Sequence, residues 1–251
     1  MHFNSSNFKI VVIIPARYES SRLPGKPLIN LLGVPMIVRT FRQCAKVIDS
    51  NDIYVATDDD RIKSVCESFG IKALITSSKC LTGTDRIAEV TKLVDADIYI
   101  NIQGDEPLMN PLDILTIKNA ALKYPNLIIN GFCEIKDEQQ FRNINIPKVV
   151  FREDGRLLYM SRASIPTNKS SQFIRSFRQV CIYAFPKKTL EAFSSRGKKT
   201  LFEEIEDIEI LRFVEMGFDV KMIELSADSI SVDVPEDVVL VEARLKSYNN
   251  L

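Results

Sequence analysis

Cations and small residues are concentrated in one short part of the sequence. Arg17, Arg22 and Lys26 stand there beside Ser20, a second serine and a glycine. Small residues let backbone N–H groups approach phosphate oxygens, and fixed positive charges offset the charge of an anion. These residues predict a polyphosphate-binding loop, with a plain solvated basic loop as the alternative.

Two common nucleotide-binding motifs are absent from this loop. A Walker A loop requires Gly-x-x-x-x-Gly-Lys-Ser/Thr, but Ser20 stands in place of the first glycine and Pro27 in place of the hydroxyl residue. The dinucleotide fingerprint Gly-x-Gly-x-x-Gly does not occur in the sequence. The loop is therefore neither a P-loop nor a Rossmann fingerprint.

Histidine chemistry is excluded by composition. The sequence has one histidine, His2, close to its first residue. This rules out Ser-His-Asp catalysis, Cys-His catalysis and histidine-rich metal sites. Any chemistry must come from carboxylates, cations and a hard metal ion.

Asp105 is a carboxylate well placed to hold such an ion. It lies in Gln103-Gly104-Asp105-Glu106-Pro107, directly after a strand predicted over residues 97–102. Open α/β folds bind ligands at the carboxyl ends of strands, and Mg²⁺ prefers oxygen ligands and bridges to phosphate. A turn aspartate is the alternative for Asp105. Periodicity alone makes Asp233, which precedes the last predicted helix, a turn residue.

A second candidate binding segment opens a helix. Thr82-Gly83-Thr84-Asp85-Arg86 contains hydroxyl groups and a glycine, and apolar residues at helical spacing follow it. The first N–H groups of a helix are free to bind a ligand. An ordinary N-cap explains the same residues without a ligand.

Buried strands and amphipathic helices alternate in the first hundred residues. Five β-branched residues, Ile10 to Ile14, predict a strand buried on both faces, which we expect Pro15 to end. Other strands and helices follow the same pattern, with strands over residues 53–56, 71–76 and 97–102 and a first helix over 36–47. This alternation predicts a mostly parallel sheet with helices on both faces.

The second half is less regular. The strands predicted there cover residues 127–133, 148–151, 178–185 and 218–225. The clearest helix covers residues 200–216, with Thr200 and Glu203 as a capping box and Gly217 as its stop. Its predicted buried stripe is Leu201, Ile205, Ile208, Leu211 and Val214.

The composition is that of an ordinary soluble protein. The 251 residues suffice for one α/β domain, and Lys plus Arg equals Asp plus Glu at 33 each. A balanced charge gives no support to nucleic-acid binding, and no run of residues is long and apolar enough for membrane insertion. Five scattered cysteines fit free thiols in a reducing compartment, so we expect a cytoplasmic protein.

Four separated motifs resemble those of sugar-activating cytidylyltransferases, most closely the 3-deoxy-manno-octulosonate cytidylyltransferase (CMP-Kdo synthetase) family. The resemblance covers residues 9 to about 245. It rests on Pro15-Ala16-Arg17 with Arg22-Leu23-Pro24-Gly25-Lys26-Pro27-Leu28, on Thr82 to Arg86, on Gln103 to Pro107, and on Ser231-Val232-Asp233-Val234-Pro235-Glu236-Asp237. It implies a three-layer α/β nucleotidyltransferase fold with a mostly parallel, Rossmann-like mixed sheet. A smaller sugar-binding and dimerisation lobe is expected at about residues 127–190.

The resemblance also implies an activity. The anomeric hydroxyl of a 3-deoxy-ulosonic acid attacks the α-phosphorus of CTP, giving a CMP-sugar for lipopolysaccharide or another surface glycan, and pyrophosphate. The implied catalytic residues are Arg17, Lys26, Asp105 and Asp233, of which the two aspartates hold Mg²⁺. The implied nucleotide-binding residues are Pro15, Ala16, Arg17, Ser20, Arg22, Lys26, Thr82, Gly83, Arg86 and Gln103. The implied sugar-binding residues are Arg162, Gln179, Tyr183, Glu209 and Ile210.

The chain departs from the family pattern on the sugar side. Gln179 replaces a histidine, Cys181 a glycine and Ile210 a glutamine. These changes leave the identity of the ulosonic acid open, Kdo or an altered analogue. A CTP-binding regulatory protein without catalysis and a nucleotidyltransferase for another base or sugar are the alternatives. The family suggests a homodimer, with contacts near residues 167–176.

Overall fold

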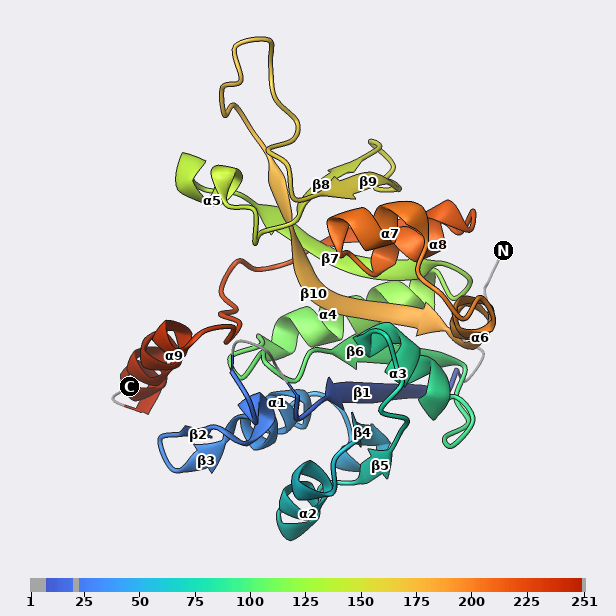
Figure 1. Cartoon of the computed structure of the whole chain (residues 1–251), viewed down its shortest axis with the longest axis vertical. Coiled ribbons are helices and arrows are strands. Elements are labelled where there is room, and N and C mark those ends of the chain that lie inside the picture. The colour runs from blue at the N-terminus through green and yellow to red at the C-terminus, as the bar shows by residue number, and fades with distance from the viewer. Residues whose placement is uncertain (1–7, 20–22, 250–251) are drawn as a thin grey trace.

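One twisted mixed sheet forms the centre of the molecule. The computed structural model describes residues 8–19 and 23–249, and nine strands of that part form this sheet (Figure 1). In spatial order its main strands are β11 (Val220–Glu224), β7 (Ile128–Glu134), β10 (Phe177–Pro186), β6 (Ile98–Ile102), β1 (Ile10–Ala16), β4 (Ile53–Thr57) and β5 (Ala73–Ile75). Two more strands, β8 (Lys148–Phe151) and β9 (Leu157–Ser161), extend it beside β10, and β2 (Asn30–Leu31) with β3 (Val34–Pro35) makes a separate hairpin.

The strand directions confirm the predicted mixed sheet. The neighbours β6, β1, β4 and β5 run parallel, as do β7 and β11. The one long antiparallel strand, β10, lies between β6 and β7 and pairs with both. The carboxyl ends of β1 and β6 therefore lie at the same edge of the sheet, where Asp105 was expected.

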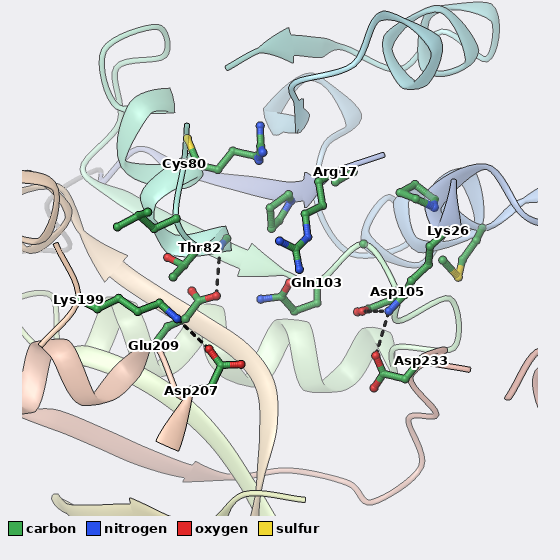
Figure 2. Close-up of a pocket in the computed structure, with 18 residues that line it drawn as sticks. Arg17, Lys26, Cys80, Thr82, Gln103, Asp105, Lys199, Asp207, Glu209 and Asp233 are labelled. Atoms are coloured by element: carbon green, nitrogen blue, oxygen red, sulfur yellow. Dashed lines mark hydrogen bonds and ion pairs between the residues drawn. The ribbon is translucent and has the colours of Figure 1, made fainter. Parts of the chain in front are cut away.

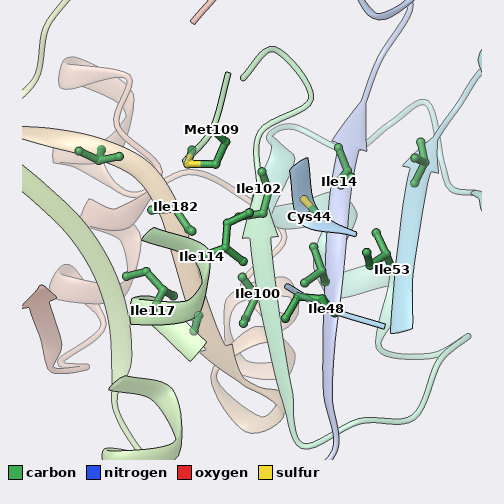
Figure 3. Packing of buried hydrophobic residues seen from close by; sticks show 14 of the residues in the cluster. Ile14, Cys44, Ile48, Ile53, Ile100, Ile102, Met109, Ile114, Ile117 and Ile182 are labelled. Atoms are coloured by element: carbon green, nitrogen blue, oxygen red, sulfur yellow. The ribbon is translucent and has the colours of Figure 1, made fainter. Parts of the chain in front are cut away.

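Helices cover both faces of the sheet. Val12 and Ile14 point toward α1 (Met36–Cys44), α2 (Asp60–Ser68) and α4 (Pro111–Lys123), the face whose packing Figure 3 shows. Val11 and Ile13 point toward α3 (Gly83–Val90), α6 (Lys187–Ser195) and α8 (Ile210–Glu215). This two-sided burial explains the unbroken β-branched run, and it confirms the three-layer fold.

The remaining α-helices lie at the margins. They are α5 (Glu138–Arg142), α7 (Leu201–Glu206) and α9 (Pro235–Asn249). Among the residues described, no helix combines the length and the apolar character that crossing a membrane requires.

The predicted end of β1 at Pro15 was wrong. The strand continues through Pro15 to Ala16, and Pro15 pairs with Ala56 of β4. The pairing of β1 with β6 ends earlier, at Ile13 and Asn101. Pro15 therefore lies where the strand is paired on one side only, a position that tolerates a residue without an N–H group.

The single helix predicted over residues 200–216 was also wrong. The structure has two helices, α7 and α8, separated by Asp207 in the left-handed region at φ 50°. The change of direction turns α7 away from the sheet, and Leu201 and Ile205 are 63% and 68% exposed. The predicted stripe is buried only after the break, at Ile208 and Leu211. The capping box and the stop at Gly217 are confirmed.

The helix α9 has a small core of its own. Val241 and Leu245 pack with Leu31, Met36 and Leu108 rather than with the main sheet. Figure 1 shows α9 (red) beside the β2–β3 hairpin, apart from the sheet. This packing carries the preceding residue Asp233 to the edge of the sheet.

Candidate active site

A cavity of about 300 Å³ opens at the carboxyl ends of β1 and β6. Segments far apart in the sequence meet around it (Figure 2). Its lining consists of Pro15, Ala16, Arg17, Lys26, Pro27, Met36, Cys80, Leu81, Thr82, Gly83, Arg86, Gln103, Gly104, Asp105, Lys199, Asp207, Glu209 and Asp233.

One end of the cavity holds a lysine between two carboxylates. Lys26 Nζ lies 2.6 Å from Asp105 Oδ2 and 3.1 Å from Asp233 Oδ1. Burial disfavours the charge on Lys26, but the two carboxylates outweigh it, so the pKa of this ammonium is raised. The structure thus places one cation between the two aspartates that the sequence singled out.

The same pair of carboxylates suits a divalent cation. Lys26 shows that a positive charge can contact Asp105 and Asp233 together. In the part of the chain that is described, no group of three or more histidine, cysteine or acidic residues could hold a metal. A site with two protein carboxylates leaves coordination positions for water and phosphate oxygens, which is how Mg²⁺ is usually bound. The residues therefore fit Mg²⁺, the ion that the family resemblance implies.

The cavity floor depends on Gly104. A Cβ atom at this position would lie 2.8 Å from the carbonyl oxygen of Pro15, which is closer than real Cβ contacts. Because that oxygen belongs to the backbone of β1, it cannot move aside cheaply. Gly104 thus allows the segment from Gln103 to Asp105 to lie against the end of β1.

The helix start at Thr82 is held from across the cavity. Asp85 N donates to Thr82 Oγ1, a true N-cap at 3.1 Å. The Glu209 carboxylate accepts hydrogen bonds from Gly83 N at 3.1 Å and Thr84 N at 2.8 Å. Burial raises the pKa of Glu209, and these donors oppose that shift. Two N–H groups that could have bound a ligand are thus bound by Glu209.

A buried ion network fixes α3 against α7 and α8. The fully buried guanidinium of Arg212 contacts Glu203 Oε1 at 2.6 Å and Asp85 Oδ1 at 2.8 Å. Arg212 also lies over the ring of Phe193, 3.6 Å from its centroid. Two walls of the cavity are therefore locked together by one arginine.

Arg86 is anchored on the opposite side of α3. Its guanidinium donates to Asp58 Oδ2 at 2.9 Å and to the hydroxyl of Thr76, and it is nearly buried. Arg86 lines the cavity. Its two partners fix its direction before any ligand binds.

Three predicted sugar-binding residues do not line the cavity. Gln179, Tyr183 and Ile210 are all buried. Gln179 Nε2 donates to Asn130 Oδ1 at 3.0 Å and to the hydroxyl of Tyr183 at 3.1 Å. Cys181 lies between them on β10, and burial raises the pKa of its thiol to about 12. None of these four side chains belongs to the cavity lining.

The predicted sugar-binding residue Arg162 also lies outside the lining. Its guanidinium donates to the carbonyl oxygens of Glu206 at 2.5 Å, Asp207 at 3.1 Å and Ile144 at 3.2 Å. It therefore satisfies the carbonyl groups at the break between α7 and α8. Two further predicted residues, Ser20 and Arg22, lie outside the described residues.

The structure adds cavity residues that the sequence analysis missed. Cys80 and Leu81 directly precede the Thr82 motif, so their position next to it was a usable signal. Lys199 and Asp207 gave no such signal, because Asp207 was placed inside a continuous helix. Lys199 Nζ lies 2.8 Å from Asp207 Oδ1, at the side of the cavity away from Lys26 (Figure 2).

A family model described as "Cytidylyltransferase" matches residues 11–223 of the chain. The chain belongs to the cytidylyltransferase family. The matched region includes Lys26, Asp105 and Glu209, whereas Asp233 lies just after it. The family therefore accounts for the main sheet and most of the cavity walls.

Relatives of this cytidylyltransferase have closely related names. An 8-amino-3,8-dideoxy-manno-octulosonate cytidylyltransferase of Shewanella halifaxensis is 40% identical over 94% of this chain and 98% of its own length. A 3-deoxy-manno-octulosonate cytidylyltransferase of Escherichia coli is 36% identical over 94% of this chain and 95% of its own length. The solved structure of a CMP:2-keto-3-deoxy-manno-octonic acid synthetase complexed with CTP is 35% identical, with a TM-score of 0.89 over 96% of this chain and 99% of that chain.

Proposed function

We propose that this cytidylyltransferase couples a 3-deoxy-ulosonic acid to CMP, using CTP and releasing pyrophosphate. The observation that carries the proposal is the meeting of Lys26, Asp105 and Asp233 at one end of a cavity. The names of the relatives and the CTP complex of the similar structure support both substrates. The CMP-sugar would serve lipopolysaccharide or other surface-glycan synthesis, in the cytoplasm.

The chemistry requires control of negative charge. The sugar acid and CTP are both anionic, and the hydroxyl of one must approach the α-phosphorus of the other. We assign Arg17 and Lys26 to the β- and γ-phosphates, where they stabilise the departing pyrophosphate. Pro15, Ala16, Thr82, Gly83, Arg86 and Gln103 form the nucleotide-facing walls in this assignment.

Asp105 and Asp233 would hold Mg²⁺, which brings the anionic groups together and polarises the phosphate when bound. Lys26 contacts both carboxylates in the structure. We expect its ammonium to turn from the carboxylates toward phosphate oxygens when CTP binds. Lys26 thus neutralises the two carboxylates before CTP binds and the phosphates afterwards.

The substrate class is tested by pyrophosphate release from purified protein with CTP, Mg²⁺ and a panel of sugars. The panel contains Kdo, 8-amino-3,8-dideoxy-manno-octulosonate and a sialic acid. We expect release with at least one of the first two, and release with neither would overturn the proposal. Replacing CTP by the other nucleoside triphosphates tests the base, and equal rates would favour another nucleotidyltransferase.

Two sugars remain candidates because relatives of both names are similar to this chain. Gln179 and Ile210 are buried and do not line the cavity, so any effect on the sugar is indirect. We propose them, with Arg162 and Tyr183, as residues that set the choice between these sugars. The ratio of turnover with the two sugars, in the wild type and in Gln179→His, tests this role.

A regulatory CTP-binding protein without catalysis is the rival function. Binding alone has less need of two carboxylates around a cation. CTP binding without pyrophosphate release, for every sugar in the panel, would favour this rival.

We also propose a homodimer. The apolar side chains Leu201, Phe202 and Ile205 of α7 are exposed, and so is Ile174 in the long connection between β9 and β10 that projects from the body in Figure 1. Exposed apolar surface of this kind is typical of a protein interface. We assign these segments, within the lobe of residues 127–190 and the adjoining α7, to the contact between subunits.

A further inference from the structure

A charge pair on one wall of the cavity has no part in the mechanism above. Lys199 precedes α7 and Asp207 follows it, and their charged atoms lie 2.8 Å apart. The hydrogen bond from Lys199 lowers the pKa of Asp207, and the same contact raises the pKa of Lys199, so each residue stabilises the charged form of the other. Both side chains line the cavity, on the wall opposite Lys26 (Figure 2).

This wall is joined to the segments predicted to bind sugar. Glu206, the last residue of α7, accepts hydrogen bonds from Ser161 Oγ at 2.6 Å and Arg162 N at 2.8 Å. Glu209, the predicted sugar-binding acid, follows two residues after Asp207. Lys199 and Asp207 are thus on the sugar side of the cavity rather than the triphosphate side.

A sugar acid needs a cation for its carboxylate, and Arg162 is already bound elsewhere. The guanidinium of Arg162 is bound to three backbone carbonyl groups and does not line the cavity. Of the other lining cations, Lys26 is paired with two aspartates, Arg86 is paired with Asp58, and Arg17 is assigned above to the phosphates of CTP. Lys199 is the lining cation on the sugar-side wall.

The partner of Lys199 is easy to replace. The Asp207 side chain is 74% exposed, whereas that of Lys199 is 27% exposed. Exposed ion pairs contribute little because water screens them. A carboxylate brought by a ligand can therefore take the place of Asp207 at a Lys199 ammonium that is already held in position.

We propose that Lys199 binds the carboxylate of the sugar acid, with Asp207 holding the ammonium in place until substrate enters. This inference rests on the proposed function and adds a substrate-binding residue to it. The same ammonium would favour sugars with an acid group over neutral ones, so the pair also contributes to the choice of substrate class.

Steady-state kinetics of Lys199→Met test the inference. Loss of a charged hydrogen bond raises the KM for the sugar acid about ten- to hundredfold, and the KM for CTP changes less than about twofold. Lys199→Arg, which keeps the charge, restores most of the loss. The matched control is Lys198→Met, which removes an exposed neighbouring lysine and should leave both constants unchanged.

A second substrate separates direct contact from a structural effect. The neutral methyl ester of the same sugar should be a poorer substrate than the acid for wild type, and equal to it for Lys199→Met. Asp207→Asn should not raise the KM for the acid. An unchanged KM for the sugar acid, or a raised KM for CTP alone in Lys199→Met, would overturn the inference. Failure of the wild type to release pyrophosphate with any ulosonic acid would overturn the proposed function instead.

Discussion

At the scale of single residues, Asp105 is the most informative position. Asp105→Asn keeps the size of the side chain but removes one of the two charges around Lys26. We expect turnover to fall by about two orders of magnitude or more, because a catalytic metal supplies several kcal/mol of stabilisation in the transition state. Pyrophosphate release, Mn²⁺ binding and circular dichroism should show lost activity, weaker metal binding and an unchanged fold.

The control for Asp105→Asn is Asp228→Asn, which changes an exposed aspartate after β11. Its turnover should equal that of the wild type. Near-normal turnover of Asp105→Asn would contradict the assignment of Asp105 as a metal ligand.

The neighbouring carboxyl group, Glu106, gives a prediction for pH. Burial, followed by the charge of Asp105, raises the pKa of Glu106 from 4.5 to about 7. Between about pH 4.5 and pH 7 the Glu106 carboxyl keeps its proton in the folded protein but loses it in the unfolded chain. The free energy of unfolding therefore falls as the pH rises through this range. Glu106→Gln should therefore be stabilising relative to wild type above about pH 7.

Urea denaturation of both proteins in EDTA, at about pH 4.5 and about pH 8, measures this effect. The difference in unfolding free energy should be near its full value at the higher pH and small at the lower one. A difference of the same size at both would show that Glu106 does not titrate in this range.

At the scale of elements, the contact between β1 and the segment after β6 decides the shape of the site. Gly104→Ala would place a methyl group against the Pro15 carbonyl. We expect the free energy of unfolding to fall by about 1–3 kcal/mol, since overpacking forces the backbone to shift. Activity should fall as well, because Asp105 moves with the same segment.

Thermal denaturation compares this variant with Gly83→Ala. A Cβ at Gly83 would meet its neighbours at 3.6 Å or more, which is ordinary contact. Gly83→Ala should therefore keep the wild-type melting temperature. Equal melting temperatures for all three proteins would contradict the close-packing argument.

The elements also show what a sequence can predict. Two-sided burial in β1 and the capping box at Thr200 follow from residue types close together in the chain, and both were predicted correctly. The structure also shows the N-cap at Thr82 that was the alternative for that segment. The break at Asp207 depends on Arg162, more than forty residues away, which binds the carbonyl groups there. No local periodicity contains that contact.

The site shows the same division. Arg17, Lys26, Asp105 and Asp233 belong to compact motifs, and the structure brings them to one cavity. Lys199 lies in no motif, and its place in the cavity beside Asp207 appears only in the folded structure. The directions of Arg162 and Gln179 likewise follow from tertiary contacts that their residue types do not specify.

At the scale of the whole molecule, the proposed dimer predicts a mass in solution of about twice the 28.5 kDa of one chain. Ile205→Glu places a charge on the exposed apolar face of α7. It should shift light-scattering mass toward the monomer, because burying an unpaired charge in an interface is costly. The matched control is Leu112→Glu, because Leu112 is 67% exposed on α4, on another part of the molecule.

A monomeric wild type would contradict the proposed dimer. A dimer that persists in Ile205→Glu would show that the interface does not include this face of α7. Loss of dimer in both variants would point to a general effect of added charge.

The position of Asp233 in the sequence has a consequence for the synthesis of the protein on the ribosome. Lys26 and Asp105 leave the ribosome early, but Asp233 is made 128 residues after Asp105. At typical rates of translation this interval lasts roughly 6 to 26 seconds. During that time a nascent chain can form much of the sheet while its cation site has one carboxylate. Truncated translation products therefore lack the complete site, and sugar activation begins only with chains made as far as α9.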